Sequence, residues 1–309
     1  MSKIAVVVPS IRPESLITFL GKWEKLFAKH EIMLVIVFDG ENPRVEYFQY
    51  RNPQKGINMG GNCLDFMGKD KDLIFNLNDG VRNLGFAYIA TYMPEIETII
   101  TLDDDTEPCG DTIQDHLDAL NQKVPVSWIS TTNEYTRGFP YGIREEAEVV
   151  LSHGVWEGVP DYDAPTQLVT KPHEVYFNNG AIPKGIFYPM CGMNIAFKRK
   201  MLPYMYFAPM GHKVGLDRFA DIWCGINSKK EIDKRGWAVV TGQATVLHKR
   251  ASNVFANLKK EAPGLELNET YWQGDISGNP KYFKLYQDSY KRWQKFVKMN
   301  DMQKRGDCK

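Results

Sequence analysis

Over the first 120 residues, short apolar runs alternate with a segment in which apolar residues recur every three or four positions. The runs Ile4–Val8, Met33–Phe38 and Ile99–Leu102 are rich in β-branched residues, which is typical of strands buried on both faces. The helical spacing lies between the first two runs, at Leu16, Phe19, Leu20, Trp23, Leu26 and Phe27. A strand–helix–strand order implies a right-handed crossover between parallel strands. The pattern therefore predicts an α/β fold on a mixed, mainly parallel sheet.

The apolar run that ends at Leu102 is followed at once by three aspartates, Asp103, Asp104 and Asp105. Open α/β sheets bind ligands at the carboxyl ends of their strands. Three adjacent carboxylates repel one another unless a cation lies among them, and Mg²⁺ or Mn²⁺ commonly combines one or two carboxylates with substrate phosphates. We expect Asp103 and Asp105 to bind the metal, and Asp103 and Asp104 to face a nucleotide sugar. A solvated acidic turn or a helix cap is the alternative for such a run.

Other polar residues follow the same predicted edge. Asp39 comes directly after the second strand, close to Pro9 at the end of the first, and its carboxylate suits a base or a ribose. An Asp-Gly turn is the alternative there. Arg82 opens a predicted helix that runs to about Thr91, where its charge and the helix dipole would favour a diphosphate. A plain surface arginine is the alternative.

Beyond residue 125 the periodicity weakens, and aromatic, glycine and proline residues crowd together at 137–144, 152–156 and 160–168. Rigid rings with polar neighbours suit a sugar site, although a loop-rich structural lobe has the same composition. We expect one domain with a nucleotide-binding half at 1–125 and a sugar-binding, catalytic half at 126–262. A helical extension at 263–309 completes the predicted organisation.

Four candidate residues lie in the second half. Asn194 belongs to a late strand, and Asp221 lies on a predicted helix, where an acid is ordinarily a solvated residue. His248 and Lys249 end another strand, and His248 has the chemistry to complete a metal site or to touch phosphate, although a lone histidine is more often structural. Aromatic residues at helical spacing over 282–299 predict an amphipathic helix that docks on the core, on another subunit or weakly on a membrane.

Composition narrows the functional classes. The chain has 309 residues, with 38 basic and 38 acidic side chains, so no overall field favours nucleic acid or an anionic membrane. We find neither a secretory signal pattern nor an apolar run long enough to cross a bilayer, so we expect no transmembrane segment. The five cysteines are scattered without metal-type spacing, which favours reduced thiols in a cytoplasmic protein.

Taken together, the segments resemble the reversibly glycosylated polypeptides, the UDP-arabinopyranose mutases of plants. The most specific stretches are RGFPYGIRE (137–145), SHGVWEGVPDYDAPTQL (152–168), IPKGIFYPMCGMNIAF (182–197) and ASNVFANLKKE (251–261). The resemblance implies a fold similar to the GT-A αβα sandwich and a flavin-independent interconversion of UDP-arabinopyranose and UDP-arabinofuranose with Mn²⁺ or Mg²⁺. It also implies homo-oligomers and reversible self-glycosylation on an arginine, whose matching position is Arg144.

Two departures from the family bear on the mechanism. The first of two adjacent acids that the family commonly carries is Ala220 here, and the region beyond about 262 shows no clear match. A guanidinium is normally protonated and a poor nucleophile, so a glycosyl-arginine at Arg144 would need help from a carboxylate such as Asp163 or Asp221. An electrostatic brace, or a side reaction of a reactive sugar cation, is the alternative for Arg144. A UDP-sugar glycosyltransferase with Asp221 as base and a non-catalytic self-glycosylated subunit are the competing functions.

Overall fold

The structure is a computed structural model that describes residues 2–51, 54–129, 132, 134–170, 175, 177–249 and 253–306, with the backbone alone for 51–63 and 302–306. Its described strands join in one sheet in the order β4-β3-β2-β1-β5-β10-β8-β11-β6, with β7 paired to β8 and β9 to β11. Their bounds are β1 Ile4–Ser10, β2 Met33–Phe38, β3 Arg44–Arg51, β4 Gln54–Cys63, β5 Thr98–Leu102, β6 Thr106–Pro108, β7 Lys123–Val124, β8 Ala147–Gly158, β9 Gly180–Ala181, β10 Asn194–Lys198 and β11 Ala238–His248.

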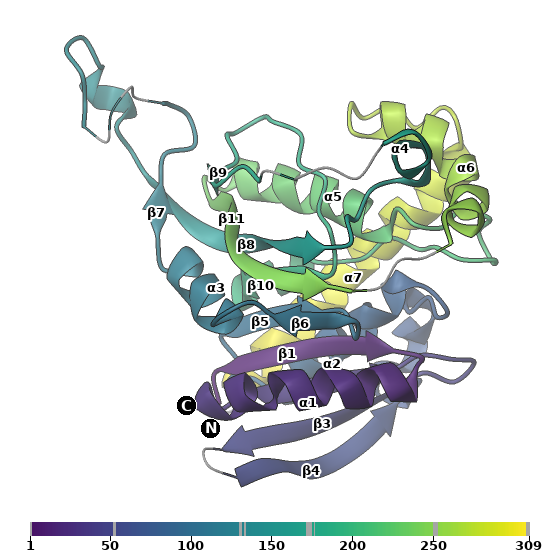
Figure 1. Cartoon of the computed structure of the whole chain (residues 1–309). Helices are drawn as coiled ribbons and strands as arrows, with labels where there is room; N and C mark the ends of the chain where they lie inside the picture. The colour runs from purple at the N-terminus through teal and green to yellow at the C-terminus, as the bar shows by residue number, and fades with distance from the viewer. Residues whose placement is uncertain are drawn as a thin grey trace.

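Helices cover both faces of this sheet (Figure 1). α1 and α3 contribute Phe19, Trp23 and Ile113 to the apolar core of one face. α2, α5 and α7 contribute Phe86, Trp223 and Trp293 to the core of the other. The helices are α1 Pro13–Lys29, α2 Arg82–Tyr92, α3 Thr112–Leu120, α4 Ala164–Val169, α5 Ala220–Lys234, α6 Val254–Tyr271 and α7 Pro280–Gly306, with short 3₁₀ segments η1 Leu64–Leu73, η2 Asp79–Val81, η3 Tyr141–Ile143 and η4 Arg199–Tyr204. The predicted α/β sandwich is confirmed.

The sheet is mixed, but fewer pairs of adjacent strands are parallel than we expected. The parallel ladders are β1 with β2, β1 with β5 and β8 with β11. β10 lies between β5 and β8 and runs antiparallel to both. Since β10 is antiparallel to both neighbours, β5 and β8 run in the same direction. Their carboxyl ends therefore lie on the same side of the sheet.

The close fit of α2 on the sheet depends on one glycine. A Cβ atom at Gly85 would lie 2.6 Å from Val7 Cγ1 and 2.9 Å from Val37 Cγ2. Glycine therefore lets the α2 backbone approach β1 and β2 more closely than any larger residue allows. This contact fixes the start of α2, which carries Arg82, against the strand ends.

Several elements differ from the prediction. We predicted no element between Phe38 and Arg82, where the structure has the hairpin β3–β4 followed by η1 and η2. β8, which we expected to be loop, is a long central strand. α6 runs across the expected boundary at 262/263, and Trp293 and Tyr286 of α7 are fully buried. The C-terminal segment is therefore part of the core and not an extension. Residues 250–252, in the predicted strand after His248, lie outside the described residues.

The thiols of Cys109, Cys191 and Cys224 are free. Within the described residues, no helix is long and apolar enough to cross a membrane.

Candidate functional site

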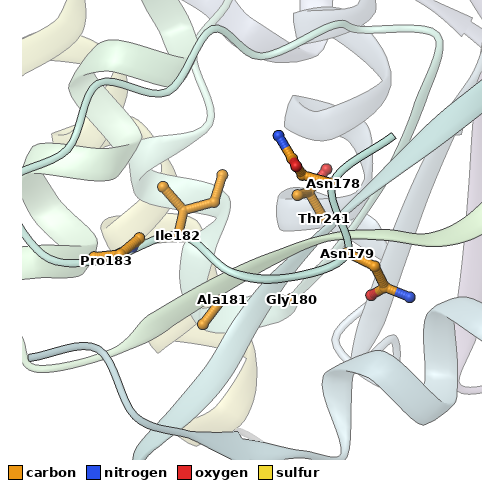
Figure 2. Close-up of a pocket in the computed structure, with 7 residues that line it drawn as sticks. All are labelled: Asn178, Asn179, Gly180, Ala181, Ile182, Pro183 and Thr241. Atoms are coloured by element: carbon orange, nitrogen blue, oxygen red, sulfur yellow. The ribbon is translucent and has the colours of Figure 1, made fainter. Parts of the chain in front are cut away.

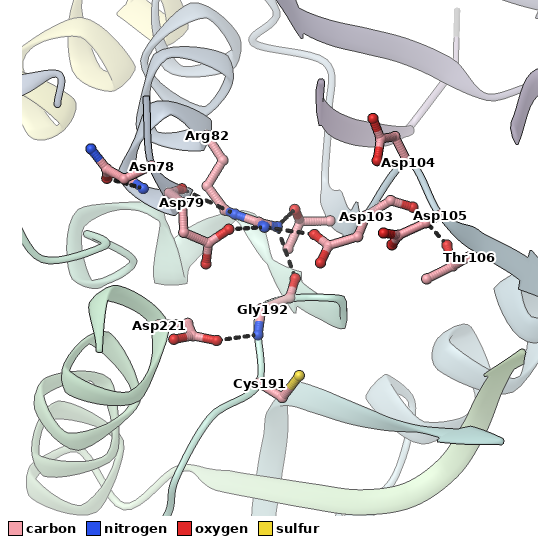
Figure 3. Close-up of polar contacts among 12 residues, drawn as sticks. Asn78, Asp79, Arg82, Asp103, Asp104, Asp105, Thr106, Cys191, Gly192 and Asp221 are labelled. Atoms are coloured by element: carbon pink, nitrogen blue, oxygen red, sulfur yellow. Dashed lines mark hydrogen bonds and ion pairs between the residues drawn. The ribbon is translucent and has the colours of Figure 1, made fainter. Parts of the chain in front are cut away.

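The three aspartates after β5 form the centre of the site and point in different directions (Figure 3). The Asp103 N–H donates to the Met193 carbonyl at 3.2 Å, and the Thr106 N–H donates to the Asp103 carbonyl at 3.2 Å. These backbone bonds fold the chain into a tight turn at the strand end. We call Asp103, Asp104 and Asp105 the aspartate corner.

Asp104 anchors the corner to the end of β1. Its carboxylate is 4% exposed, accepts a hydrogen bond from Ser10 Oγ at 2.5 Å and pairs with the Arg12 guanidinium. The expected contact of Asp104 with a nucleotide sugar is therefore replaced by an internal ion pair that joins β5 to the β1–α1 loop.

Asp103 is held by Arg82. Arg82 Nη2 donates to Asp103 Oδ1 at 2.7 Å and to Asp79 Oδ1 at 2.5 Å. Burial, with Asp79 and Asp105 nearby, raises the pKa of Asp103 to about 7, although Arg82 opposes that shift. The two carboxylates that share this arginine are only partly neutralised, which leaves the corner able to accept a further positive charge.

Arg82 itself does not reach a ligand. Its side chain is 1% exposed, and its Nη1 donates to Thr101 Oγ1 at 2.7 Å and to the Gly192 carbonyl at 2.8 Å. Nε donates to the Asp79 carbonyl at 3.3 Å, so all five N–H groups are accounted for. The predicted diphosphate contact of Arg82 is corrected to a positioning role for Asp79, Asp103 and the Gly192 backbone.

Asp105 faces His248 at the end of β11. Asp105 Oδ1 lies 3.9 Å from His248 Nε2. His248 Nδ1 lies 2.9 Å from the Val159 carbonyl, which can only accept, so Nδ1 carries the proton and Nε2 keeps its lone pair. Metal-binding histidines typically donate their other ring N–H to a carbonyl or carboxylate, as His248 does to Val159.

The donors fit Mn²⁺ or Mg²⁺ if water or a bound ligand adds the remaining oxygen atoms. Among the described residues, no group of three or more His, Cys, Asp or Glu side chains is arranged to hold a metal alone. Asp105 and His248 supply two donors, with Asp103 as a partly neutralised neighbour. Mg²⁺-type ions commonly take the remaining oxygens from substrate phosphates and water.

Gly192 links the corner to Asp221. The Gly192 N–H donates to Asp221 Oδ2 at 2.9 Å while its carbonyl accepts from Arg82 (Figure 3). Burial, and then Asp79, raise the pKa of Asp221 to about 7. Asp221 therefore exchanges protons readily near neutral pH, as a general acid or base requires.

Cys191, beside Gly192, binds a second acidic residue, Asp161. Its Sγ donates to Asp161 Oδ2 at 2.9 Å, and its N–H donates to His153 Nε2 at 3.2 Å. Burial, together with Asp161 and Asp221, holds the pKa of the thiol well above its ordinary value. Cys191 is thus a neutral donor to Asp161, whose charge acts on Asp221 as well.

On the other side of the corner, Pro9 and Asp39 lie at the ends of β1 and β2, as predicted. Asp39 Oδ1 accepts hydrogen bonds from the backbone N–H of Leu77 and Gly40, both at 2.8 Å. Burial raises the pKa of Asp39 despite these bonds. Asp39 fixes the loop before α2, and its contact with a nucleotide stays a prediction.

Three further predicted residues have structural partners. Asn194 is 1% exposed; its Oδ1 lies 2.8 Å from His116 Nε2 and its Nδ2 donates to the Val155 and Ala244 carbonyls. Asp163 caps α4 by accepting from the Thr166 N–H and hydroxyl. These bonds exclude a substrate contact for Asn194 and make Asp163 a helix cap. Lys249 pairs with Glu107 at 2.9 Å at the rim.

A separate cavity of about 310 Å³ opens beside β9 (Figure 2). Its walls come from residues 178–183 and from Thr241 of β11. None of the predicted site residues lines it, so it does not bear on the chemistry of the corner.

Residues 1–274 match the profile of the family described as "Reversibly glycosylated polypeptide". The chain belongs to the reversibly glycosylated polypeptide family.

Relatives in this family have been named for an activity. "Probable UDP-arabinopyranose mutase 4" of Arabidopsis thaliana is 32% identical over 97% of this chain and 83% of its own length. "UDP-arabinopyranose mutase 3" of the same plant is 34% identical over 88% and 75%. Among solved structures, the catalytic domain of Drosophila beta1,4galactosyltransferase 7 with xylobiose aligns over 84% of this chain and 81% of that one, at 13% identity and a TM-score of 0.37. At that score the likeness carries no weight for function.

Arg144, the position that the resemblance predicts to be glycosylated, lies far from the corner. Thr101 and His153 both pair with Ile195, so they are level in the sheet. β8 begins at Ala147, which places the residues before it roughly 20 Å away at about 3.3 Å per strand residue. The segment between β7 and β8 then projects away from the sheet (Figure 1).

Arg144 is packed within that projecting segment. Its guanidinium lies 4.2 Å from the Tyr135 ring centroid and 3.9 Å from that of Tyr141, and its Nη2 donates to the Phe139 carbonyl at 2.9 Å. Within one chain, the expected contact between Arg144 and Asp221 does not occur. Arg144 precedes the amino end of β8, whereas Asp221 contacts Gly192 near the carboxyl ends of β5 and β8.

Sequence reasoning missed four residues that contact the predicted site residues or lie beside them. Asp79 and Arg12 pair with residues that were predicted, and a strand-end prediction that included β1 could have found Arg12. Asp161 lies two residues before the predicted Asp163, an offset that only the contact with Cys191 reveals. Arg218, with a left-handed φ of 71°, donates to the buried Glu261 at 3.2 Å just before α5. A strained backbone beside a site is a signal that no sequence pattern carries.

Proposed function

We propose that this protein is a UDP-arabinopyranose mutase that interconverts UDP-arabinopyranose and UDP-arabinofuranose with a divalent cation and without flavin. The observation that carries the proposal is the joining of two acidic groups through one glycine: the aspartate corner and Asp221 both contact the Gly192 backbone or its partner Arg82. Membership of a family whose relatives are named for this activity supports it. We also propose a cytoplasmic homo-oligomer, as the resemblance implies.

The corner is the proposed diphosphate site. Asp105 and His248 would hold Mn²⁺ or Mg²⁺, which supplies positive charge to the departing UDP. Arg82 keeps Asp103 and Asp79 oriented toward that side, and Asp39 and Pro9 lie where the nucleoside would extend. This division would put the sugar beside Gly192 and Asp221, which are already joined by a hydrogen bond.

Asp221 is the proposed proton carrier. Exchanging a pyranose for a furanose ring requires the anomeric carbon to leave UDP and a different sugar hydroxyl to close on it. The closing hydroxyl gives up a proton and the former ring oxygen takes one. A carboxyl with a pKa of about 7 has both forms available at neutral pH, so Asp221 suits both transfers.

Self-glycosylation of Arg144 is proposed as a reaction between chains. The bond from the anomeric carbon to UDP would break, the carbon–Nη bond would form, and the guanidinium proton would pass to a carboxylate of the neighbouring chain's site. Because Arg144 and Asp221 occupy opposite edges of the sheet, a second chain must bring them together. Mixing labelled UDP-sugar, inactive D221N chains and active R144A chains tests this, with label on the D221N chain as the expected result.

The deciding experiment incubates the purified protein with UDP-arabinofuranose and Mn²⁺ without any acceptor. Formation of UDP-arabinopyranose supports the mutase, and D221N should abolish it while leaving UDP binding intact. Slow release of UDP and free sugar would instead favour a glycosyltransferase awaiting its acceptor. Tight UDP binding with no turnover would favour a non-catalytic subunit, for which Ala220 in place of a family acid is the motivating difference.

A further inference from the structure

Arg12 is the arginine in direct contact with two carboxylates of the aspartate corner. It lies in the loop between β1 and α1, and its Nη2 contacts Asp104 Oδ1 and lies 3.1 Å from Asp105 Oδ2. The corner therefore carries a positive charge of its own in the metal-free protein. That charge offsets part of the repulsion between the adjacent carboxylates.

Asp105 is shared between this arginine and the proposed metal donor. One oxygen, Oδ2, faces Arg12, while the other, Oδ1, lies 3.9 Å from His248 Nε2. A cation that binds Asp105 draws on the same negative charge that now attracts Arg12. The two positive charges therefore compete for one carboxylate.

Arg12 is also better placed than its neighbours to meet a phosphate. Arg82 is buried with every N–H used, and Lys249 is paired with Glu107. The Arg12 side chain is 30% exposed, and its described hydrogen bonds to the corner use Nε and Nη2. Nη1 belongs to the same planar fork, which matches phosphoryl oxygens.

We propose that Arg12 exchanges with the divalent cation at Asp105 and binds the diphosphate of the UDP-sugar once the cation is in place. Asp104 would keep its contact with Arg12 throughout, because it is buried and also accepts a hydrogen bond from Ser10 Oγ at 2.5 Å. Only the contact of Arg12 with Asp105 has to be given up. This inference rests on the proposed nucleotide-sugar function for its second half, whereas the competition at Asp105 does not depend on it.

The test uses R12Q, R12K and the control K3Q, which removes an exposed lysine paired with Glu97 at the amino end of β1. Mn²⁺ affinity without nucleotide is measured by electron paramagnetic resonance, and UDP affinity in saturating Mn²⁺ by calorimetry. In R12Q we expect Mn²⁺ to bind several-fold more tightly and UDP to bind about ten-fold more weakly, since the competing charge and the phosphate contact are both lost. R12K should move both affinities the same way by less, and K3Q should change neither.

Opposite shifts of the two affinities cannot come from a loss of folding, which weakens both together. If both fall along with the melting temperature, or if neither changes, the proposal is wrong. If R12Q does not fold, R12K carries the same comparison. Failure of the wild-type protein to bind UDP would overturn the proposed function, while the nucleotide-free Mn²⁺ titration would still decide whether Arg12 competes with the cation.

Discussion

The guanidinium of one buried residue, Arg82, pairs with both Asp79 and Asp103. Arg82 therefore determines the geometry of the site. Arg82 is fully buried and bridges both carboxylates, Thr101 and the Gly192 carbonyl. Removing one partner of a buried ion pair leaves the other charges uncompensated. The site is therefore organised by a residue that substrate does not touch.

We predict that R82M lowers the free energy of unfolding by about 1–3 kcal/mol, less than the roughly 3–5 kcal/mol for a fully buried ion pair, because the Asp79 and Asp103 side chains are 36% and 34% exposed. Because the cost comes from stranded carboxylates, the double variant R82M/D103N should recover part of it. Urea unfolding at pH 7 measures both. A loss below about 1 kcal/mol in R82M would show that the carboxylates relax into solvent.

Gly192 sets the distance between the two acidic groups. An added Cβ would lie 3.0 Å from Phe207 Cε1, 3.1 Å from Asp79 Oδ2 and 3.4 Å from Arg82 Cζ. We predict that G192A reduces turnover at least ten-fold while costing about 1–3 kcal/mol of stability, the range for overpacking. G21A is the matched control: Gly21, in α1, has nothing within 4 Å of its Cβ position and should leave activity unchanged. Equal turnover in G192A and the wild type would contradict this role.

At the scale of elements, β8, β10 and α3 meet at His116, which lies behind the site. His116 Nε2 lies 2.8 Å from Asn194 Oδ1, and its Nδ1 lies 2.9 Å from Ser152 Oγ. Asn194 Nδ2 donates to two carbonyls, so its oxygen accepts and His116 Nε2 carries the proton. Burial lowers the pKa of this neutral imidazole to about 4.

This lowered pKa predicts acid sensitivity with a definite sign. The unfolded histidine titrates near 6.5, so the unfolded state binds the proton first, and stability is lost as the pH falls from about 6.5 to about 4. The loss amounts to about 3 kcal/mol, at 1.36 kcal/mol per pKa unit. H116Q should have a flatter profile than the wild type in urea unfolding at pH 7, 5.5 and 4.5. His153, whose pKa burial also lowers to about 4, should keep part of the slope. Parallel profiles would contradict the assignment.

The same elements explain what the sequence could predict. β1, β2 and β5 consist mainly of apolar residues, many of them β-branched, so both their burial and the polar residues that follow them could be predicted. β8 was missed because Ser152, His153 and Gly154 interrupt it. A Cβ at Gly154 would fall 2.0 Å from Asn194 Nδ2, so this glycine follows from a close approach across the sheet and not from local propensity.

The site residues divide in a similar way. Asp105 lies 3.9 Å from His248 and Asp221 accepts from Gly192, whereas Asn194, Arg82 and Asp163 bind other groups of the protein. Local sequence cannot distinguish an exposed polar side chain from one satisfied by distant backbone groups. The bonds of Asn194 to Val155 and Ala244 span 39 and 50 residues.

For the molecule as a whole, α7 packs the C-terminal part of the described chain against elements of the first half. Trp293 is fully buried and its Nε1 donates to the Leu202 carbonyl at 3.0 Å, while Arg292 reaches Asp70 at 2.9 Å and Asp72 at 2.7 Å. α7 packs on α2, the helix that begins with Arg82. The end of the chain thus supports the aspartate corner through one intervening helix.

We predict that W293A costs about 3–5 kcal/mol, the range for deleting a large buried aromatic side chain, and that UDP binding weakens because α2 loses its support. L285A, at a position 40% exposed on the same helix, should stay within about 0.5 kcal/mol of the wild type.

Ending the chain at Gly278 removes all of α7 and should prevent cooperative folding, since the core of one sheet face loses Phe283, Tyr286 and Trp293 together. Calorimetric melting of the three proteins measures this. A truncated chain that melts like the wild type would mean that α7 is an appendage after all.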